Sequence, residues 1–193
     1  ARLDEATGFH AYELNVSCPN TRAGGLAFGS DPAALTVVVS RARAATRRPI
    51  FVKLSPTLQD IGAAAKCAVD AGADGITVIN TLPGLAIDLE TRRPALGFGS
   101  GGVSGPGLLP VGVLATVLVR RAVSVPIIGV GGVWKAEHVL QYLVAGASLV
   151  AVGTAQLVDP RTSERIVRDL ARWCAARGVD RIADLTGSLS WEA

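Results

Sequence analysis

Short apolar runs alternate along the chain with longer segments in which apolar residues recur at helical spacing. The short runs predict β-strands, whereas apolar positions three and four residues apart predict helices that are buried on one side. Five strands are predicted, at residues 12–16, 50–54, 75–80, 126–129 and 148–152. Helices are predicted at residues 32–46, 60–71, 106–121, 136–144, 162–177 and 181–185, and a surface hairpin at 87–96.

The order of these elements predicts an α/β fold, because apolar strands that alternate with helices pair into a parallel sheet. Two layouts compete, an open doubly wound sheet and a (β/α)8 TIM barrel. Polar or glycine residues stand at the carboxyl end of each predicted strand: Asn15, Lys53, Asn80, Gly129 and Gly153. A barrel gathers such groups from several strands around one opening, whereas a doubly wound sheet concentrates them at one point. The barrel is therefore the preferred prediction.

The length of the chain limits this prediction. A complete barrel has eight strands and takes about 250 residues, whereas this chain has 193 residues and five predicted strands. The chain also contains no methionine and begins at Ala1. We therefore expect an incomplete TIM barrel, with about five of the eight strands and the N-terminal part missing. Residues 1–193 would form the C-terminal part of a single domain.

The composition excludes several classes of protein. Apolar residues make up 49% of the chain and charged residues 18%, which excludes a disordered tail. The net charge is +3 and no basic stripe lies beside aromatic residues, so no nucleic-acid partner is expected. The uncharged stretches at 94–119 and 139–158 are interrupted by glycine or polar residues, so no membrane helix is expected. No signal peptide begins the sequence, and a cytoplasmic protein is predicted.

One of the three cysteines has polar neighbours. Cys67 and Cys174 are expected to be small buried residues of helices, and the cysteine spacing indicates neither a disulfide nor a metal site. Cys18 instead follows a predicted strand, within the sequence NVSCPN at 15–20. Amides on either side of a thiol can hold a planar polar substrate while the thiol acts as a base. The alternative is a turn that uses Asn and Pro only for its backbone conformation.

Lys53 is the only charged residue of the strand predicted at 50–54. A buried ammonium group is costly unless it meets an anion or another acceptor. At the opening of a barrel this lysine can stabilise an anionic cofactor ring, which is the interpretation we favour. The alternative is a lysine whose aliphatic part packs on the sheet while its charge reaches water.

Three glycine-rich turns indicate a bound phosphate, at residues 101–105, 129–132 and 153–154. Glycine lets backbone N–H groups approach a phosphate closely, and barrels commonly bind phosphate in the loops after their last two strands. The last two predicted strands lead into Gly129 and Gly153. None of the turns matches the dinucleotide pattern G-x-G-x-x-G in the required context, so a mononucleotide such as FMN is predicted.

Eight motifs, in order along the chain, resemble the dihydroorotate dehydrogenases. They are ELNVSCPN (13–20), FGSDP (28–32), VKLSP (52–56), AGADG (71–75), INT (79–81), GGVSGP (101–106), GVGGV (129–133) and AGASLVAVGT (145–154). The similarity covers nearly the whole chain and is greatest to the soluble bacterial type, which works with an iron–sulfur flavoprotein subunit and NAD. The membrane-bound type has serine as its base, so Cys18 itself favours the soluble type.

The resemblance implies a role for each motif in oxidising dihydroorotate to orotate during pyrimidine (UMP) biosynthesis. Cys18 would take the proton from C5 while hydride leaves C6 for N5 of FMN. Substrate binding is implied for Asn15, Asn20, Asn80 and Thr81. FMN binding is implied for Lys53, Ile79, Ser104, Gly105, Gly131, Gly132, Gly153 and Thr154. No residue is assigned to a metal.

The resemblance also implies partners. A homodimer is expected, and electrons would pass to NAD through a partner subunit that carries FAD and a 2Fe–2S cluster. Leu109 and the pair Gly97–Phe98 depart from the residues usual in the family, which leaves open whether substrate or partner contacts differ.

Two other functions remain open at this point. Dihydropyrimidine dehydrogenase shares the Ser-Cys-Pro sequence and similar glycine turns, although the hairpin at 83–100 and residues 79–81 fit the orotate enzyme better. An inactive fragment or interaction scaffold is the other alternative, because five strands cannot close a barrel.

Overall fold

A computed structural model describes residues 2–17 and 26–191 of the chain. Its strands are β1 (Tyr12–Asn15), β2 (Ile50–Leu54), β3 (Gly75–Val78), β4 (Leu82–Gly84), β5 (Ile87–Asp88), β6 (Arg93–Pro94), β7 (Gly101–Val103), β8 (Ile127–Val130) and β9 (Leu149–Ala151). Its α-helices are α1 (Leu26–Ser30), α2 (Pro32–Ala45), α3 (Ile61–Asp70), α4 (Leu109–Ala122), α5 (Ala136–Ala145), α6 (Thr154–Val158) and α7 (Thr162–Arg177). Three 3₁₀ helices are η1 (Arg2–Glu5), η2 (Pro106–Leu108) and η3 (Ile182–Leu185).

Five parallel strands form the central sheet, in the order β1-β2-β3-β8-β9. This order follows the chain, so it lacks the reversal that a doubly wound sheet requires. Asn15 is in register with Lys53, and Lys53 with Thr77, which places the carboxyl ends of three strands side by side. The predicted parallel α/β architecture is confirmed, and the doubly wound alternative is excluded for this sheet.

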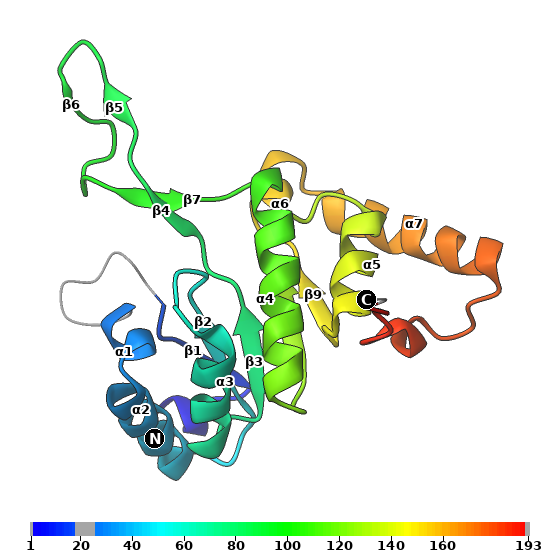
Figure 1. Cartoon of the computed structure of the whole chain (residues 1–193), viewed down its shortest axis with the longest axis horizontal. Helices are drawn as coiled ribbons and strands as arrows, with labels where there is room; N and C mark the ends of the chain where they lie inside the picture. The colour runs from blue at the N-terminus through cyan, green and yellow to red at the C-terminus, as the bar shows by residue number, and fades with distance from the viewer. Residues whose placement is uncertain (1, 18–25, 192–193) are drawn as a thin grey trace.

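Helices cover one face of the sheet. The helices α2, α3, α4 and α5 pack in sequence, each against the next, and Figure 1 shows α3 and α4 beside the sheet. In β2, Ile50, Val52 and Leu54 are fully buried, whereas Phe51 and Lys53 between them are half-buried. Because side chains alternate between the faces of a strand, the buried set faces the helices and the other set lies on the less covered face.

Side-chain caps and glycines set the limits of several helices. The Asp31 carboxylate accepts a hydrogen bond from Ala33 N–H at the start of α2, and Asp60 accepts one from Ala63 N–H at the start of α3. Such caps satisfy N–H groups that have no partner inside the helix. The helix α7 ends at Arg177 and is capped by Gly178, whose left-handed conformation (φ 64°) is one that glycine adopts without strain.

A hairpin arm, residues 82–103, extends away from the sheet and helices (Figure 1). The strands β4 and β7 pair antiparallel at its base, and β5 pairs with β6 nearer its tip. The predicted surface hairpin is therefore confirmed. The predicted glycine-rich turn at 101–105 is wrong for its first three residues, which form β7. Gly102 packs so closely against Thr81 that a Cβ atom would overlap the threonine hydroxyl, which gives this glycine a packing role.

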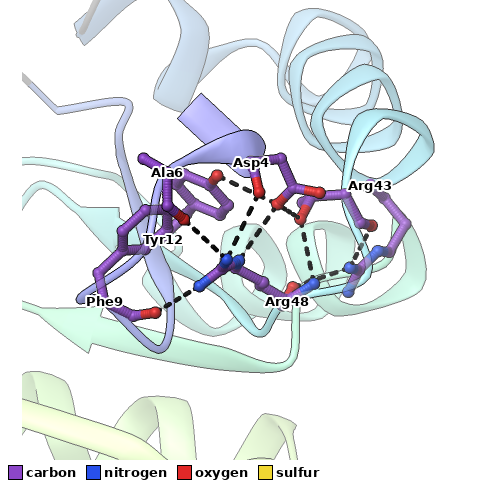
Figure 2. Close-up of polar contacts among 7 residues, drawn as sticks. Asp4, Ala6, Phe9, Tyr12, Arg43 and Arg48 are labelled. Atoms are coloured by element: carbon purple, nitrogen blue, oxygen red, sulfur yellow. Dashed lines mark hydrogen bonds and ion pairs between the residues drawn. The ribbon is translucent and has the colours of Figure 1, made fainter. Parts of the chain in front are cut away.

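Charged side chains are paired at the amino ends of β1 and β2 (Figure 2). The Asp4 carboxylate accepts a hydrogen bond from the Tyr12 hydroxyl at 3.1 Å and lies 3.4 Å from Arg48 Nε. Arg48 also donates to the carbonyl oxygens of Ala6, at 3.0 Å, and Phe9. Its guanidinium carbon lies 4.3 Å from the centre of the Phe9 ring. Arg48 thus connects the segment before β1 to the start of β2.

The same edge continues toward β3 through a second ion pair. Arg43 Nη1 lies 2.7 Å from Asp74 Oδ2, and that oxygen also accepts from Ile50 N–H at 2.8 Å. The Thr46 hydroxyl donates to Asp4 Oδ1, and this bond is the main reason why the pKa of Asp4 is lowered from its ordinary value. We call this set of residues the amino edge; it comprises Asp4, Phe9, Tyr12, Arg43, Thr46, Arg48 and Asp74.

No helix within residues 2–17 and 26–191 is long and apolar enough to cross a membrane.

Two of the cysteines lie in helices of the described ranges. Cys67 and Cys174 are free thiols, and the expectation that both are buried is met only in part, because both side chains are half-buried. Cys67 Sγ lies 3.3 Å from Thr36 Oγ1, between α3 and α2.

Candidate functional site

A cavity of about 170 Å³ opens at the carboxyl ends of β2, β3, β8 and β9. Its walls come from segments that follow different strands, so residues distant in the sequence meet there. All eight residues predicted to bind the cofactor line it: Lys53, Ile79, Ser104, Gly105, Gly131, Gly132, Gly153 and Thr154. Asn80 and Thr81, which are predicted to bind substrate, line it as well. The structure therefore brings together residues that separate motifs predict.

Lys53 lines the cavity from the less covered face of β2. Its side chain is half-buried, and its ammonium group has no hydrogen-bond or ion-pair partner within residues 2–17 and 26–191. The carboxylate of Glu13, on the neighbouring strand, accepts from the Thr77 hydroxyl at 2.7 Å instead. A partly desolvated cation without a counter-ion gains most from an anionic ligand, so the environment of Lys53 favours one.

Asn15, Ser17 and Asn80 form a hydrogen-bonded cluster between the carboxyl ends of β1 and β3. Ser17 Oγ donates to Asn15 Oδ1 at 2.9 Å, and Asn80 Nδ2 donates to Ser17 Oγ at 3.0 Å. Asn80 Oδ1 in turn accepts from Thr81 N–H at 2.8 Å. Ser17 is almost fully buried and joins the two amides. This cluster fixes the residue that directly precedes Cys18 in the sequence.

The turn that follows β8 faces the cavity with its backbone. Gly131 and Gly132 have φ values of 129° and 69°, in the region that favours glycine. A Cβ atom at Gly132 would overlap the backbone nitrogen of Leu109, at the start of α4. The N–H groups of Gly132 and Val133 donate to no acceptor in the part of the chain that the structure describes. Successive N–H groups without partners at a concave surface suit an anion such as a phosphate.

Two hydroxyl groups join further walls of the cavity. Thr154 Oγ1 donates to Ser104 Oγ at 2.7 Å, which connects the start of α6 to the segment between β7 and η2. Gly105 follows with a φ of 111° and is buried. Each hydroxyl of this pair keeps an unused lone pair or proton with which it can bind a polar ligand.

Two larger hollows, each of about 600 Å³, lie between helices, one along α2 and α3 and the other along α3 and α4. Size alone would favour them as ligand sites. Neither is lined by any residue predicted to bind substrate or cofactor. The smaller cavity combines a lysine, hydroxyls, an amide and backbone N–H groups, and a few convergent polar groups distinguish a ligand site better than volume does. We therefore assign the candidate site to the smaller cavity.

Comparison with known proteins decides the family. Residues 6–173 match the family model described as dihydroorotate dehydrogenase. The chain belongs to the dihydroorotate dehydrogenase family. The resemblance inferred from the ordered motifs is thereby confirmed.

Several bacterial relatives have the same name, dihydroorotate dehydrogenase B (NAD(+)), catalytic subunit. The chain is 46% identical over 188 residues to the protein from Pelobacter propionicus, an alignment that covers 97% of this chain and 62% of the relative. It is 46% identical over 189 residues to the protein from Trichlorobacter lovleyi, covering 98% and 62%. For Desulforudis audaxviator the identity is 46% over 187 residues, covering 97% and 61%. The chain thus spans about 62% of the length of the curated relatives it matches.

In this member of the dihydroorotate dehydrogenase family, two predicted site residues are not described by the structure, and two residues at the site were not predicted. Cys18 and Asn20 lie outside the described residues, so their roles stay predictions. Ser17, which precedes Cys18 in the NVSCPN motif, was not predicted to have a role, yet it is the centre of the amide cluster. Trp134 also lines the cavity and was not predicted to do so. Its position directly after the GVGGV motif is the one signal in the sequence that could have indicated it.

Proposed function

We propose that this chain carries the FMN site and the catalytic residues of a dihydroorotate dehydrogenase, which oxidises dihydroorotate to orotate in pyrimidine biosynthesis. One observation carries the proposal: a single cavity is lined by ten residues that separate motifs assign to cofactor or substrate. The names of the relatives support the same reaction.

The sheet is proposed to belong to a (β/α)8 barrel. The unreversed strand order and the packing of successive helices on one face support this fold. The other face supports it as well, because Glu13, Lys53 and Thr77 lie there in adjacent strands and would turn toward the interior of a closed barrel. The cavity at the carboxyl ends of the strands is then at the end of the barrel where active sites form.

The residues of the cavity fit FMN. The partnerless N–H groups of Gly132 and Val133, with the hydroxyls of Ser104 and Thr154, would hold the phosphate. Lys53 would lie against the flavin ring. A volume of about 170 Å³ is below the roughly 300–1,000 Å³ of a ligand pocket, so this hollow would hold only part of the cofactor. When bound, FMN would supply the hydride acceptor for the oxidation.

Four polar residues would hold the substrate while a thiol removes its proton. Cys18 would take the proton from C5 of dihydroorotate and keep it while hydride leaves C6. Asn15, Asn20, Asn80 and Thr81 would bind the pyrimidine ring and its carboxylate. The Nδ2 group of Asn15 donates to no acceptor within the described ranges, so it is available for such a contact. The buried Ser17 would fix the start of the loop that carries the thiol.

Partners follow from the same proposal. Electrons would leave through a second subunit, an iron–sulfur flavoprotein with FAD and a 2Fe–2S cluster, and reach NAD. The relatives support this arrangement, because their names include both NAD(+) and a catalytic subunit. A homodimer of this chain in the cytoplasm completes the proposal.

Anaerobic single-turnover reduction of the flavin by dihydroorotate tests the proposal in the full-length protein. Cys18→Ala should slow flavin reduction by about 10²–10⁴-fold, the usual contribution of a positioned base, while FMN still binds. Cys18→Ser should retain some activity at higher pH, because a hydroxyl is a weaker acid than a thiol. Cys67→Ala, which changes a cysteine that does not line the cavity, is the matched control and should reduce its flavin at the wild-type rate. Equal rates in wild type and Cys18→Ala would contradict the assignment of the base.

A further inference from the structure

Two side chains of α5 reach back to the turn that follows β8. The Tyr142 hydroxyl donates to the carbonyl oxygen of Gly131 at 2.8 Å. His138 Nδ1 lies 3.0 Å from the carbonyl oxygen of Gly132 and 3.2 Å from the backbone nitrogen of Trp134. Residues four apart share one face of a helix, so the two side chains meet consecutive peptide groups of the turn together. Neither side chain lines the cavity itself.

These contacts decide where the N–H groups of the turn point. In a trans peptide the carbonyl and the N–H of the same unit point in opposite directions. The Gly131 carbonyl shares its peptide with the N–H of Gly132, and the Gly132 carbonyl shares its peptide with the N–H of Val133. Both carbonyls face α5, so both N–H groups face away from α5, and these are the two donors without a protein acceptor in the described residues.

Tyr142 lies in a slot that two glycines leave open. A Cβ atom at Gly112, on α4, would overlap the Tyr142 hydroxyl, and one at Gly129, on β8, would overlap its ring. The side chain is fully buried, and this burial raises the pKa of Tyr142 well above its ordinary value, so the hydroxyl keeps its proton and remains a donor. The ring is carried by α5 and packs against α4 and β8, so its hydroxyl oxygen has little freedom to move.

His138 contacts the turn in either neutral form. When Nδ1 carries the proton it can donate to the Gly132 carbonyl, and when it does not it can accept from Trp134 N–H. Both arrangements connect residues 132–134 to α5. The bond to the Gly132 carbonyl, which orients the N–H of Val133, forms when Nδ1 carries the proton, and the other form holds the turn through Trp134.

We propose that Tyr142 and His138 are positioning residues, which hold the N–H groups of Gly132 and Val133 toward the phosphate of FMN. This inference rests on the proposed function, because it deepens the assignment of the cofactor site. It extends that site to a second layer of side chains on α5, which acts on the cofactor only through the backbone of the turn. It predicts that losing either side chain weakens phosphate recognition specifically.

The test compares FMN with riboflavin, which lacks the phosphate, as ligands of the deflavinated full-length protein. Tyr142→Phe removes the donor and keeps the ring in its slot. It should weaken FMN binding by about tenfold, the value of one or so hydrogen bonds, and leave the Kd for riboflavin unchanged. His138→Ala should do the same. His138→Asn, which can place an amide atom near the position of Nδ1, should restore part of the lost FMN affinity. Gln141→Ala, an exposed position on the same helix, is the control and should change neither Kd.

The outcomes separate this inference from the proposed function. Wild-type protein that binds FMN no more tightly than riboflavin would contradict the phosphate site and the inference with it. Wild-type preference for FMN that persists in Tyr142→Phe and His138→Ala would overturn the inference and leave the proposed function intact. Equal weakening of both ligands in the variants would also overturn it, because that result indicates a packing role.

Discussion

At the amino ends of β1, β2 and β3, Arg43 and Arg48 form ion pairs, whereas Lys53, at the carboxyl end of β2, forms none within residues 2–17 and 26–191. Arg43 and Arg48 each bind a carboxylate and several carbonyl oxygens. Lys53, one strand length away, has no partner in the described residues. Both regions are built on one sheet, and both contain half-buried charge.

Paired and unpaired charges affect the stability of the folded state in opposite ways. Paired charges with satisfied hydrogen bonds lower the free energy of the folded state, and removing one partner leaves the other desolvated. A half-buried cation without a partner raises the free energy of the folded state, so its retention is better explained by a ligand. The amino edge is thus a stabilising region, and the carboxyl ends of the strands form a binding region.

Among changes that compare the two regions, the largest effect is expected for Lys53→Met, which removes the charge and keeps an unbranched chain. The flavin reduction rate should fall by about 10²-fold, as when one group that stabilises developing charge is lost. The free energy of unfolding should stay the same or rise, because no partner is lost. Single-turnover kinetics and denaturant unfolding of the full-length protein measure the two quantities. Lys66→Met, on the exposed surface of α3, is the control and should change neither by much. A marked loss of stability in Lys53→Met would contradict the comparison.

Arg48→Gln in the amino edge is expected to lower stability without slowing flavin reduction. This change removes the ion pair with Asp4 and the bonds to the carbonyl oxygens of Ala6 and Phe9. The free energy of unfolding should fall by about 2 kcal/mol, the range for hydrogen bonds to charged groups. The reduction rate of each folded, flavin-loaded molecule should not change. Arg47→Gln, at the exposed neighbouring position, should leave both quantities unchanged. A slower reaction in folded Arg48→Gln would show that the two regions are coupled.

Acid should weaken the amino edge through Asp4. The hydrogen bond from Thr46 is the main cause of the lowered pKa of Asp4. A carboxyl whose pKa is lowered on folding contributes stability above its unfolded pKa of about 3.9, and this contribution is lost as the pH falls through the lower, folded value. Asp4→Asn should therefore be less stable than wild type near neutral pH, and the difference should shrink below about pH 4. Denaturant unfolding as a function of pH checks this, and a difference that stays constant with pH would contradict it.

The sequence predicted the binding region better than the amino edge, because local patterns can be recognised in a sequence and contacts between distant residues cannot. The apolar run of β2 and the amphipathic pattern of α7 predicted their limits correctly, because such patterns are local. The glycine turn predicted at 129–132 is wrong for its first two residues, which form the end of β8, and correct for Gly131 and Gly132, whose conformation favours glycine. The amino edge was missed, because Asp4 and Arg48 are far apart in the sequence and many other charge pairings were equally plausible. Tyr142 was missed for a similar reason: a buried position on a helix does not show what its hydroxyl contacts.

The smallest effects come from the same chemical change made once in each region. Thr46→Val removes a hydroxyl that donates to the Asp4 carboxylate, and Thr154→Val removes one that donates to the neutral Ser104 hydroxyl. Because hydrogen bonds to charged groups contribute more, Thr46→Val should lower the free energy of unfolding by about 1.5 kcal/mol and Thr154→Val by roughly 0.5 kcal/mol. The order should reverse for the Kd of FMN, since only Thr154 lines the cavity. Denaturant unfolding and flavin titration of both variants measure these four values. If Thr154→Val proved the less stable variant and bound FMN with the wild-type Kd, the hydroxyl pair of Ser104 and Thr154 would belong to the stabilising region and not to the binding region.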